Sequence, residues 1–332
     1  MGEELFRFVS GNASGAVWDF ATALYIHLMG TEPYLIVGLG EILWDLFSGK
    51  KQLGGAPANF AYMTSLLGDD AKIASRIGRD VLGAEAIQTL KSLHLDVAHL
   101  QEDDLHPTGT VIVSVNSGGQ PMYQITEGVA WDFLQRSDGW ADLARRADAV
   151  CFGSLAQRSA VSRETILDFL RHLRPDALRV FDVNLRQQFF TREILDRSAR
   201  SADIMKCNQE EVLIVARLLG SSDKDLHASA EWLLQAYRLK LLCVTRGEHG
   251  SVLFSSSVTH SHPGYQAKVV DTVGAGDAFT AALVHHYLRG SSLETMNEAA
   301  NQMGAWVASQ RGATPTADPV VLKRVRTSTS RA

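Results

Sequence analysis

A glycine-rich turn followed directly by a helix pattern occupies residues 269–284, VVDTVGAGDAFTAALV. Residues 267–271, AKVVD, read as the end of a strand, and residues 278–288 predict a helix that begins near Asp277. The turn between them, Gly274-Ala275-Gly276, would present free backbone N–H groups at a helix N-terminus, which attracts anions. The stretch therefore predicts an anion-binding turn, and it raises the question of why a carboxylate, Asp277, stands beside it.

The chain from Tyr34 onward alternates between predicted strands and predicted helices. Short apolar runs predict strands at the start of 34–47 and within 71–78, 148–156, 178–186, 202–208 and 239–247. Helix patterns cover 56–68, 81–94, 163–174, 210–220 and 228–238. Strands that are apolar on both faces and alternate with helices indicate a mostly parallel sheet covered by helices on each side. We therefore expect an α/β fold.

One segment and the two chain ends depart from this alternation of strands and helices. Residues 108–126, TGTVIVSVNSGGQPMYQIT, alternate apolar and polar side chains around a Gly-Gly pair, which predicts a hairpin with one buried face. Such a hairpin is either a lid over the site or a peripheral edge hairpin. Residues 1–33 lack the basic leader of a signal peptide, so we treat them as an N-terminal extension. Residues 326–332 form a basic tail.

The composition argues against several classes of protein. The chain has 332 residues, of which 45% are hydrophobic and 21% charged, and its net charge of −5 disfavours a nucleic-acid binder. No apolar run is long enough for a membrane-spanning helix. Cys151, Cys207 and Cys243 are far apart, which fits buried thiols of a reducing compartment. We expect a globular cytoplasmic protein.

Two familiar phosphate-binding motifs do not fit the glycine turn. A P-loop requires a lysine after its last glycine, and a dinucleotide fingerprint requires a small residue where Phe279 stands. Asp277 could simply complement the helix dipole, which is worth about 0.3–1 kcal/mol. If the anion is instead a transferring γ-phosphoryl group, Asp277 accepts the proton of an attacking alcohol, which is worth about 10²–10⁴ in rate. The two flanking glycines favour this second interpretation.

Several motifs resemble those of one enzyme family. Residues 271–279, DTVGAGDAF, resemble the C-terminal signature of the ribokinase-like (PfkB) carbohydrate kinases, and residues 53–87 resemble the N-terminal signature. The motifs KCNQEE, VTRGEHGS and GATP follow in the family's order, and GEILWD, HPTGTV, VAWDF, CFGSLAQRS and DVNLR are closest to bacterial fructokinases. The resemblance covers nearly the whole chain from Tyr34. It implies a ribokinase-like three-layer sandwich, a single domain over 34–325, and a small β lid from about 44–51 and 108–126.

The resemblance also implies roles for individual residues. It makes Asp277 the catalytic base and the backbone of Gly274, Ala275 and Gly276 the anion hole. The residues that would hold the sugar are Asp45, Gly54, Gly55, Asn59, Thr110 and Arg186. Those that would hold the nucleotide and Mg²⁺ are Asn208, Glu211, Thr245, Gly247 and Asn301. A K⁺ site would involve Asp271 and the backbone near Val273, Val307, Gly312 and Thr316.

The implied activity is ATP-dependent phosphorylation of a sugar, with D-fructose the expected acceptor and fructose 6-phosphate the product. Another sugar, a sugar acid or a nucleoside as acceptor remains an alternative, and a non-catalytic sugar-binding regulator is a third. Taken alone, Asp45 also fits a strand-end turn and Arg186 a surface arginine. The lid hairpin offers an exposed edge through which a homodimer could form.

Overall fold

The computed structural model describes residues 32–47, 49–115 and 121–328. Residues 1–31 of the expected extension, the Gly-Gly pair at 118–119 and the end of the basic tail therefore lie outside the described residues. Residues Tyr34–Ala332 form one compact unit.

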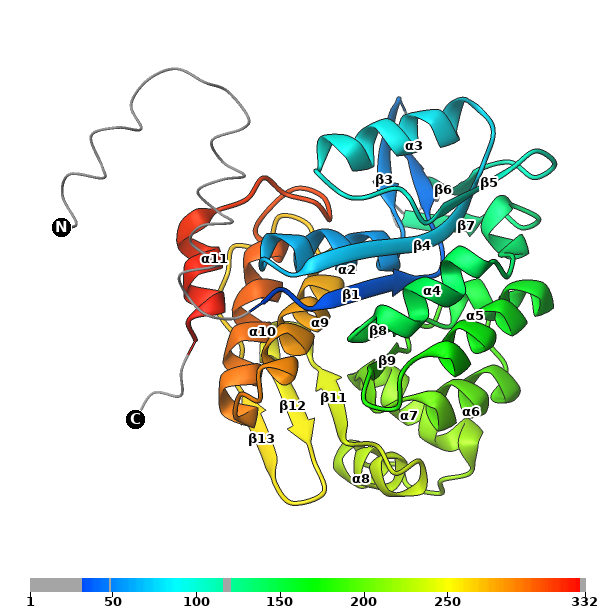
Figure 1. Cartoon of the computed structure of the whole chain (residues 1–332). Coiled ribbons are helices and arrows are strands. Elements are labelled where there is room, and N and C mark those ends of the chain that lie inside the picture. The colour runs from blue at the N-terminus through cyan, green and yellow to red at the C-terminus, as the bar shows by residue number, and fades with distance from the viewer. Residues whose placement is uncertain (1–31, 48, 116–120, 329–332) are drawn as a thin grey trace, which may run out of the picture. The chain divides into compact units, whose positions relative to one another are not determined.

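A large sheet runs through the unit (Figure 1). Its strand order is β13-β12-β11-β10-β9-β8-β1-β4-β5, and every neighbouring pair is parallel except β11–β12 and β12–β13. The strands are β1 (Leu35–Leu39), β4 (Asp70–Gly78), β5 (Leu100–Asp103), β8 (Ala149–Phe152), β9 (Leu178–Asp182), β10 (Ile204–Asn208), β11 (Leu241–Thr245), β12 (Ser251–Phe254) and β13 (Thr259–His262). The predicted mostly parallel sheet is confirmed.

Helices cover both faces of this sheet. One hydrophobic cluster joins it to α2 (Ala56–Leu66), α3 (Val81–Ser92), α9 (Ala275–Leu288), α10 (Leu293–Ala308) and α11 (Pro319–Arg326). The other joins it to α4 (Asp138–Arg146), α5 (Ala160–His172), α6 (Arg192–Ser201), α7 (Gln209–Leu219) and α8 (Leu226–Ala236). Successive residues of a strand enter opposite clusters because their side chains alternate between faces. In β8, for example, Ala149 and Cys151 face one layer and Val150 and Phe152 the other.

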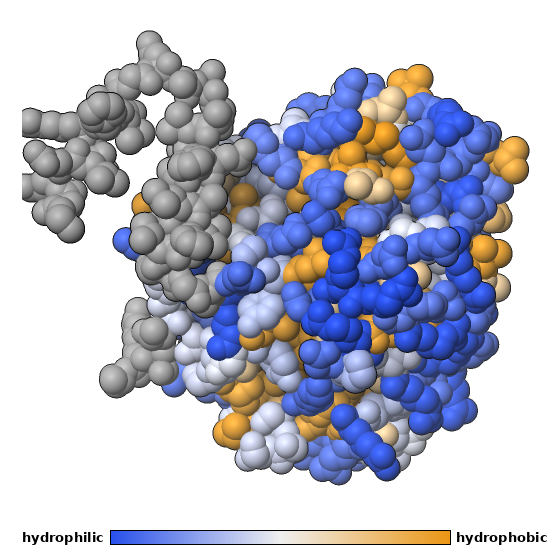
Figure 2. All heavy atoms as spheres, in the orientation of Figure 1, coloured by the Kyte–Doolittle hydropathy of each residue, from blue (hydrophilic) through white to orange (hydrophobic). Residues whose placement is uncertain are grey.

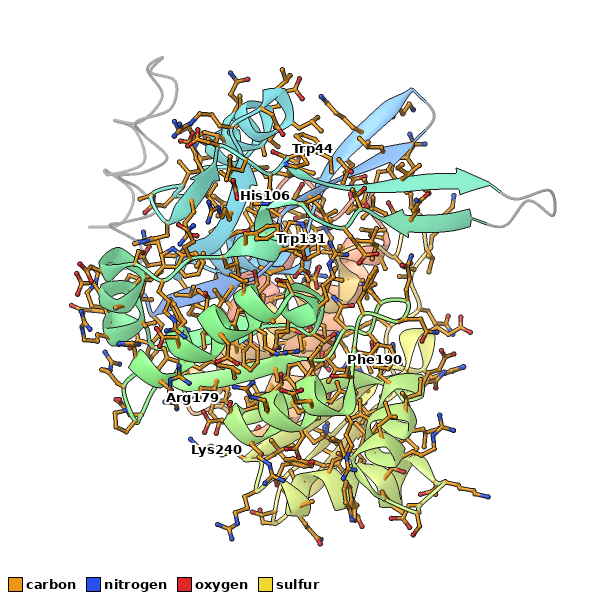
Figure 3. The ribbon with its side chains drawn as sticks, turned by 90° about the vertical axis from the view of Figure 1, so that its right-hand side faces the viewer. Trp44, His106, Trp131, Arg179, Phe190 and Lys240 are labelled. Atoms are coloured by element: carbon orange, nitrogen blue, oxygen red, sulfur yellow. The ribbon has the colours of Figure 1, made fainter. Side chains whose placement is uncertain are left out.

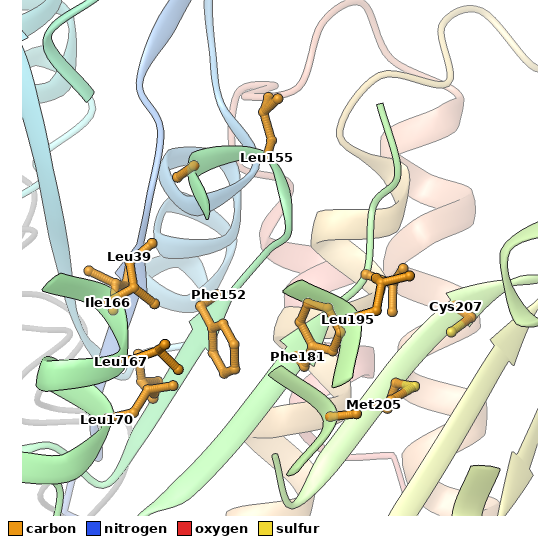
Figure 4. Close-up of a cluster of buried hydrophobic side chains, with 14 of the residues drawn as sticks. Leu39, Phe152, Leu155, Ile166, Leu167, Leu170, Phe181, Leu195, Met205 and Cys207 are labelled. Carbon is orange, nitrogen blue, oxygen red and sulfur yellow. The ribbon is translucent and has the colours of Figure 1, made fainter. Parts of the chain in front are cut away.

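Aromatic side chains fill the second of these layers. Phe152 and Phe181, from the adjacent strands β8 and β9, stack with ring centroids 5.4 Å apart (Figure 4). On the face of the molecule seen in Figure 2, hydrophilic residues predominate and hydrophobic ones form small separate patches. Among the helices of the described residues, none is both long and apolar enough to cross a membrane.

A second, smaller sheet lies beside the first (Figure 1). It has the order β3-β2-β6-β7 and consists of β2 (Leu43–Phe47), β3 (Lys50–Gly54), β6 (Gly109–Val115) and β7 (Pro121–Ile125). The indole N–H of Trp44 donates to the Leu82 carbonyl at 3.0 Å, and Lys51 pairs with Glu85, so this sheet is held to α3 (Figure 3). The expected small sheet is thus confirmed, whereas its action as a lid remains a prediction.

The expected strand end at residues 267–271 is wrong. These residues are irregular, and residues Val269 and Val270 are 59% and 49% exposed. The N–H groups of Val270 and Asp271 donate to the Ala308 carbonyl, at the end of α10, at 2.9 and 3.2 Å. This segment therefore satisfies its backbone at a helix terminus instead of a neighbouring strand, which an apolar pattern alone does not reveal.

Candidate active site

The predicted site residues gather at the carboxyl ends of the parallel strands. Arg186 follows β9, and Asn208 ends β10; Glu41, which the sequence analysis did not assign to the site, follows β1. From β1 the sheet extends to β4 on one side and to β8 on the other, so the strand order reverses at this point. Ligands of α/β proteins bind at such a switch point.

The glycine turn begins α9. Gly274 is the N-cap residue, with a left-handed φ of 80°, and a Cβ there would lie 2.5 Å from the Cβ of Ala313. The Ala275 N–H donates to the Thr272 carbonyl at 3.2 Å, so the expectation of three free N–H groups is wrong for Ala275. Within the described part of the chain, the N–H groups of Gly274, Gly276 and Asp277 have no hydrogen-bond partner. These three are available to an anion.

Asp277 occupies the first turn of α9, half-buried. The side-chain amide of Asn59, on α2, donates to Asp277 Oδ2 at 2.8 Å, and no described residue donates to Oδ1. Burial, together with the negative charge of Asp182, raises the pKa of Asp277 to about 6; the Asn59 hydrogen bond and the charges of Lys206 and Arg186 limit the rise. At neutral pH the group is mostly ionised and has one oxygen ready to accept a proton.

A buried ion pair lies directly behind the turn. Lys206 Nζ, on β10, donates to the two oxygens of Asp182 at 3.0 and 3.2 Å, and the Thr280 hydroxyl of α9 donates to Asp182 Oδ2 at 2.9 Å. A Cβ on Gly276 would lie 3.0 Å from Lys206 Nζ. Sequence reasoning missed this pair, although a single lysine within the apolar run IMKCN signals a buried charge, which must be paired.

Asp45 and Arg186, two of the residues predicted to hold the sugar, are electrostatically coupled. Burial raises the pKa of Asp45 to about 6, and the positive charge of Arg186 opposes the rise while Asp271 adds to it. Arg186 is exposed, and its guanidinium donates to the Leu185 carbonyl at 3.2 Å. Its charge also lowers the pKa of Asp277. Asp45, Arg186, Asn59 and Asp277 thus form one electrostatically coupled group.

Close packing accounts for both predicted glycines near this group. A Cβ on Gly54 would lie 2.8 Å from Asp45 Oδ2, and one on Gly55, whose φ is 107°, would lie 2.5 Å from the Glu41 carbonyl. Thr110 lies on β6, where its hydroxyl bonds the hydroxyl of Thr126 at 2.8 Å. The Thr110 side chain is therefore already engaged by Thr126, the residue that follows β7.

A cavity of about 580 Å³ adjoins the turn. Its lining includes the predicted nucleotide residues Thr245, Gly247 and Asn301, together with Gly276 and Phe279. The amide nitrogen of Asn301 already donates to Ser251 Oγ at 2.7 Å and to the Asn297 carbonyl at 2.7 Å. The turn thus lines this cavity through Ala275 and Gly276, whereas Asp45, Asn59 and Arg186 are absent from its lining.

Asn208 and Glu211 form the start of α7 and are absent from the cavity lining. Asn208 Oδ1 accepts the N–H groups of Glu210 and Glu211 at 2.9 and 2.8 Å. The two Glu211 oxygens accept the N–H groups of Leu185 and Asn208, each at 2.8 Å. The structure therefore gives the pair a capping role, and contact with Mg²⁺ or phosphate remains a prediction.

At the expected monovalent-cation site, the Asp271 carboxylate links two segments of the chain, one at Val273 and one at Gly312. Asp271 Oδ1 accepts the Val273 N–H at 3.0 Å, and Asp271 Oδ2 accepts the Gly312 N–H, also at 3.0 Å. The Val307 carbonyl accepts the Gln310 N–H at 2.9 Å, and Thr316 is exposed. No group of three or more His, Cys, Asp or Glu side chains placed to hold a metal occurs among the described residues. A site built from backbone carbonyls remains a prediction.

Comparisons with known proteins identify the family. Residues 28–319 match the model of the pfkB family carbohydrate kinases. The crystal structure of an uncharacterized sugar kinase from Pyrococcus horikoshii has 30% sequence identity and a TM-score of 0.76, covering 88% of this chain and 99% of that one. The fructokinase of Salmonella typhimurium is 33% identical over 239 residues, which are 70% of this chain and 75% of that protein. A fructokinase structure from Xylella fastidiosa, with a TM-score of 0.75 and 21% identity over 88% of this chain and 96% of that one, shares the fold.

The chain therefore belongs to the pfkB family and is a carbohydrate kinase, as its motifs indicated. Its large, mostly parallel sheet and smaller second sheet match the ribokinase-like structures of that family.

Proposed function

We propose that the protein transfers the γ-phosphate of ATP to the primary hydroxyl of D-fructose and yields fructose 6-phosphate. The observation that carries the proposal is the position of Asp277. Among the described residues, none donates to its Oδ1, and three N–H groups of the adjoining turn have no partner. The same turn lines a cavity of nucleotide size, and Asp45 and Arg186 supply polar groups suited to a sugar. ATP is present in structures of the Pyrococcus horikoshii and Xylella fastidiosa relatives, and several relatives are named fructokinases.

The proposed step is an in-line displacement. Asp277 takes the proton of the sugar hydroxyl as that oxygen bonds to the γ-phosphorus, and the bond from the γ-phosphorus to the bridging oxygen breaks to leave ADP. The N–H groups of Gly274 and Gly276 receive the charge that grows on the phosphoryl oxygens, and Lys206 supports them from behind. The aspartate beside an anion site is thus placed for the alcohol and not for the phosphate.

The proposed reaction also requires metal ions, which would bind to oxygen atoms of the protein. When bound, Mg²⁺ neutralises phosphate charge, and it prefers oxygen ligands while keeping several waters. The oxygens of Asn208 and Glu211 fit that preference through such waters, since each already accepts a backbone N–H. For K⁺, the carbonyls near Val273 and Gly312, which Asp271 holds together, are the candidate ligands.

Closure of the small sheet would exclude water from the reaction. Asp45 lies on β2, opposite Gln52 of β3, and a Cβ on Gly312 would lie 2.3 Å from Gln52 Nε2. Gln52 of the small sheet therefore packs against the loop that contains Gly312. We expect bound sugar to hold this arrangement, so ATP hydrolysis without sugar should be much slower than sugar phosphorylation. Equal rates would contradict the lid role.

One feature of the structure favours a second class of acceptor, the sugar acids. A cavity of about 560 Å³ is lined by Lys50, Arg311 and Asp271, among others. No described residue forms an ion pair with Lys50 or Arg311, so their charges could receive a sugar acid. An acceptor panel of fructose, other ketoses, aldoses, sugar acids and nucleosides, assayed for ADP release with Mg²⁺ and with or without K⁺, tests both candidates. Absence of turnover with fructose would refute the specific proposal, and turnover with a sugar acid would favour the alternative.

The cellular setting and assembly are part of the same proposal. All three cysteines are free and buried, which fits a reducing cytoplasm. Phe47 and Ile112 of the small sheet are exposed and offer an apolar surface for a homodimer. Sedimentation of the wild type at micromolar concentration tests the dimer, and a monomeric mass would refute it.

A further inference from the structure

Tyr265 is an aromatic residue in the lining of the cavity that adjoins the glycine turn. It lies in the segment that joins β13 to α9. Because the proposed transfer places the phosphates of ATP at the turn, the rest of the cavity is left for the nucleoside part of ATP. A nucleobase is flat and aromatic, and an aromatic side chain offers it a face on which to stack. Tyr265 is thus a candidate contact for the nucleoside.

The phenol of Tyr265 is tied to α10, which forms another wall of the same cavity. Its hydroxyl donates to Glu298 Oε1 on α10. Asn301 and Gly304, further along α10, line the cavity. Since residues three apart on a helix are neighbours, Glu298 lies beside Asn301. The Tyr265 side chain therefore bridges two walls of the cavity, its own loop and α10.

A second contact holds the carboxylate that receives the phenol. The Gly264 N–H donates to His262 Nδ1 at 2.9 Å, so the hydrogen of the imidazole ring is on Nε2. That Nε2 donates to Glu298 Oε2, 2.9 Å away. The two oxygens of Glu298 therefore bind both His262 and Tyr265, and they fix the segment between these residues against α10.

The backbone around this segment is closely packed. A Cβ on Gly250 would lie 2.3 Å from the Gly264 nitrogen, and a Cβ on Gly264 would lie 2.7 Å from the Glu248 carbonyl oxygen. Gly250, Gly264 and Glu248 also line the cavity. Two loops in backbone contact leave this wall little freedom to move, so the position of Tyr265 is set before a nucleotide binds. A preorganised contact of this kind lowers the entropic cost of binding.

We propose that Tyr265 is a nucleotide-binding residue whose ring packs on the nucleoside part of ATP, and that Glu298 is the positioning residue that holds this ring in place. The inference rests on the proposed function, because it needs the phosphates of ATP at the turn. Stacking of a base on an aromatic ring strengthens binding by about 10- to 100-fold. The hydrogen bond to Glu298 adds to this by keeping the ring in its binding position.

A purely structural role is the competing interpretation. The bond between Tyr265 and Glu298 would then only brace the loop against α10, and the ring itself would not touch the nucleotide. In that case, any side chain at position 265 that lacks the hydroxyl would have the same effect on nucleotide binding. A stacking contact would instead depend on whether the replacing side chain is aromatic.

The test separates the ring of Tyr265 from its hydroxyl. Tyr265→Phe loses the hydroxyl and keeps the ring, Tyr265→Leu loses both, and Glu298→Ala removes the acceptor. The matched control is Tyr237→Phe, because Tyr237 also donates to a carboxylate, that of Asp196 at 2.8 Å, but is absent from the cavity lining. Calorimetry measures the dissociation constant for ADP, and steady-state kinetics measure kcat at saturating ATP with the best acceptor. Thermal unfolding verifies the fold, and Tyr265→Met replaces Tyr265→Leu if that variant fails to fold.

We expect Tyr265→Phe and Glu298→Ala each to raise the dissociation constant for ADP by about 3- to 10-fold, and their combination to add no more, because both remove the same bond. Tyr265→Leu should raise it by about 10- to 100-fold, with kcat within a few-fold of the wild type, and Tyr237→Phe should leave it unchanged.

Equal dissociation constants for Tyr265→Phe and Tyr265→Leu would overturn the inference, and the proposed function would stand if the wild type phosphorylates fructose. If the ring effect is found but the wild type phosphorylates no sugar, the proposed function fails and the nucleotide contact stands. A wild type that binds no ADP would contradict both.

Discussion

The hydrogen bond between Asn59 and Asp277 sets the pH at which the proposed base is ionised. The Asn59 amide donates to Asp277 Oδ2 at 2.8 Å. This hydrogen bond lowers the pKa of Asp277, which burial nevertheless raises to about 6. Asn59→Leu keeps a similar volume and removes the donor. A hydrogen bond to a charged group is worth about 1.5–3 kcal/mol, and a pKa unit about 1.4 kcal/mol, so the pKa of Asp277 should rise by about 1 to 2 units.

The direction of the pH dependence of kcat/KM follows from the role of Asp277 as the base. Only ionised Asp277 can accept the proton, so kcat/KM should increase with pH through the pKa and level off above it. The wild-type limb set by Asp277 should have its midpoint near pH 6, and that of Asn59→Leu near pH 7 to 8.

The assay measures kcat/KM for the sugar from pH 5 to 9 at saturating ATP. Ser65→Ala, on the same helix but bonded to the Tyr62 carbonyl, is the control and should keep the wild-type profile. A variant midpoint that stays near pH 6 would refute the reasoning, because the hydrogen bond would then contribute nothing to the ionisation of Asp277.

Two further substitutions test the support behind the turn. Gly274→Ala should reduce kcat at least about tenfold, because residue 274 has a φ of 80° and the new Cβ would lie 2.5 Å from Ala313. The control is Gly290→Ala, at a φ of 67°, where a new Cβ would meet nothing within 4 Å. This control should keep the wild-type kcat, although its left-handed backbone costs about 1 kcal/mol in stability. Equal kcat values for the two variants would contradict a tight turn. Lys206→Met should lower the free energy of unfolding by about 3–5 kcal/mol in urea denaturation, because Asp182 would remain buried without its cation. An unchanged stability would show that the pair is not buried as described.

The fold could be predicted well where local pattern decides it. The alternation of apolar runs with helix patterns gave the parallel sheet and its covering helices, since burial on both faces demands apolar residues at every strand position. The short outer strand β13, THSH, and the segment 267–271 were beyond that reasoning. A polar edge strand carries little apolar signal, and an apolar segment can bond a helix end instead of a strand.

The site could be predicted where residues adjoin in sequence. The turn and Asp277 are contiguous, so helix-terminus physics was enough to suggest an anion site beside a base. The contacts of Lys206 with Asp182 and of Asn59 with Asp277 join residues far apart in the chain, and no spacing rule brings them together.

The most direct test of the central claim is Asp277→Asn. Asparagine keeps the shape of the side chain and an oxygen for the Asn59 amide, but it cannot take the proton of the sugar hydroxyl. Single-turnover phosphoryl transfer should slow by about 10²–10⁴, while calorimetric dissociation constants for ATP and sugar stay within a few-fold of the wild-type values. A variant that binds both ligands and transfers phosphate at the wild-type rate would contradict the assignment of Asp277 as the base.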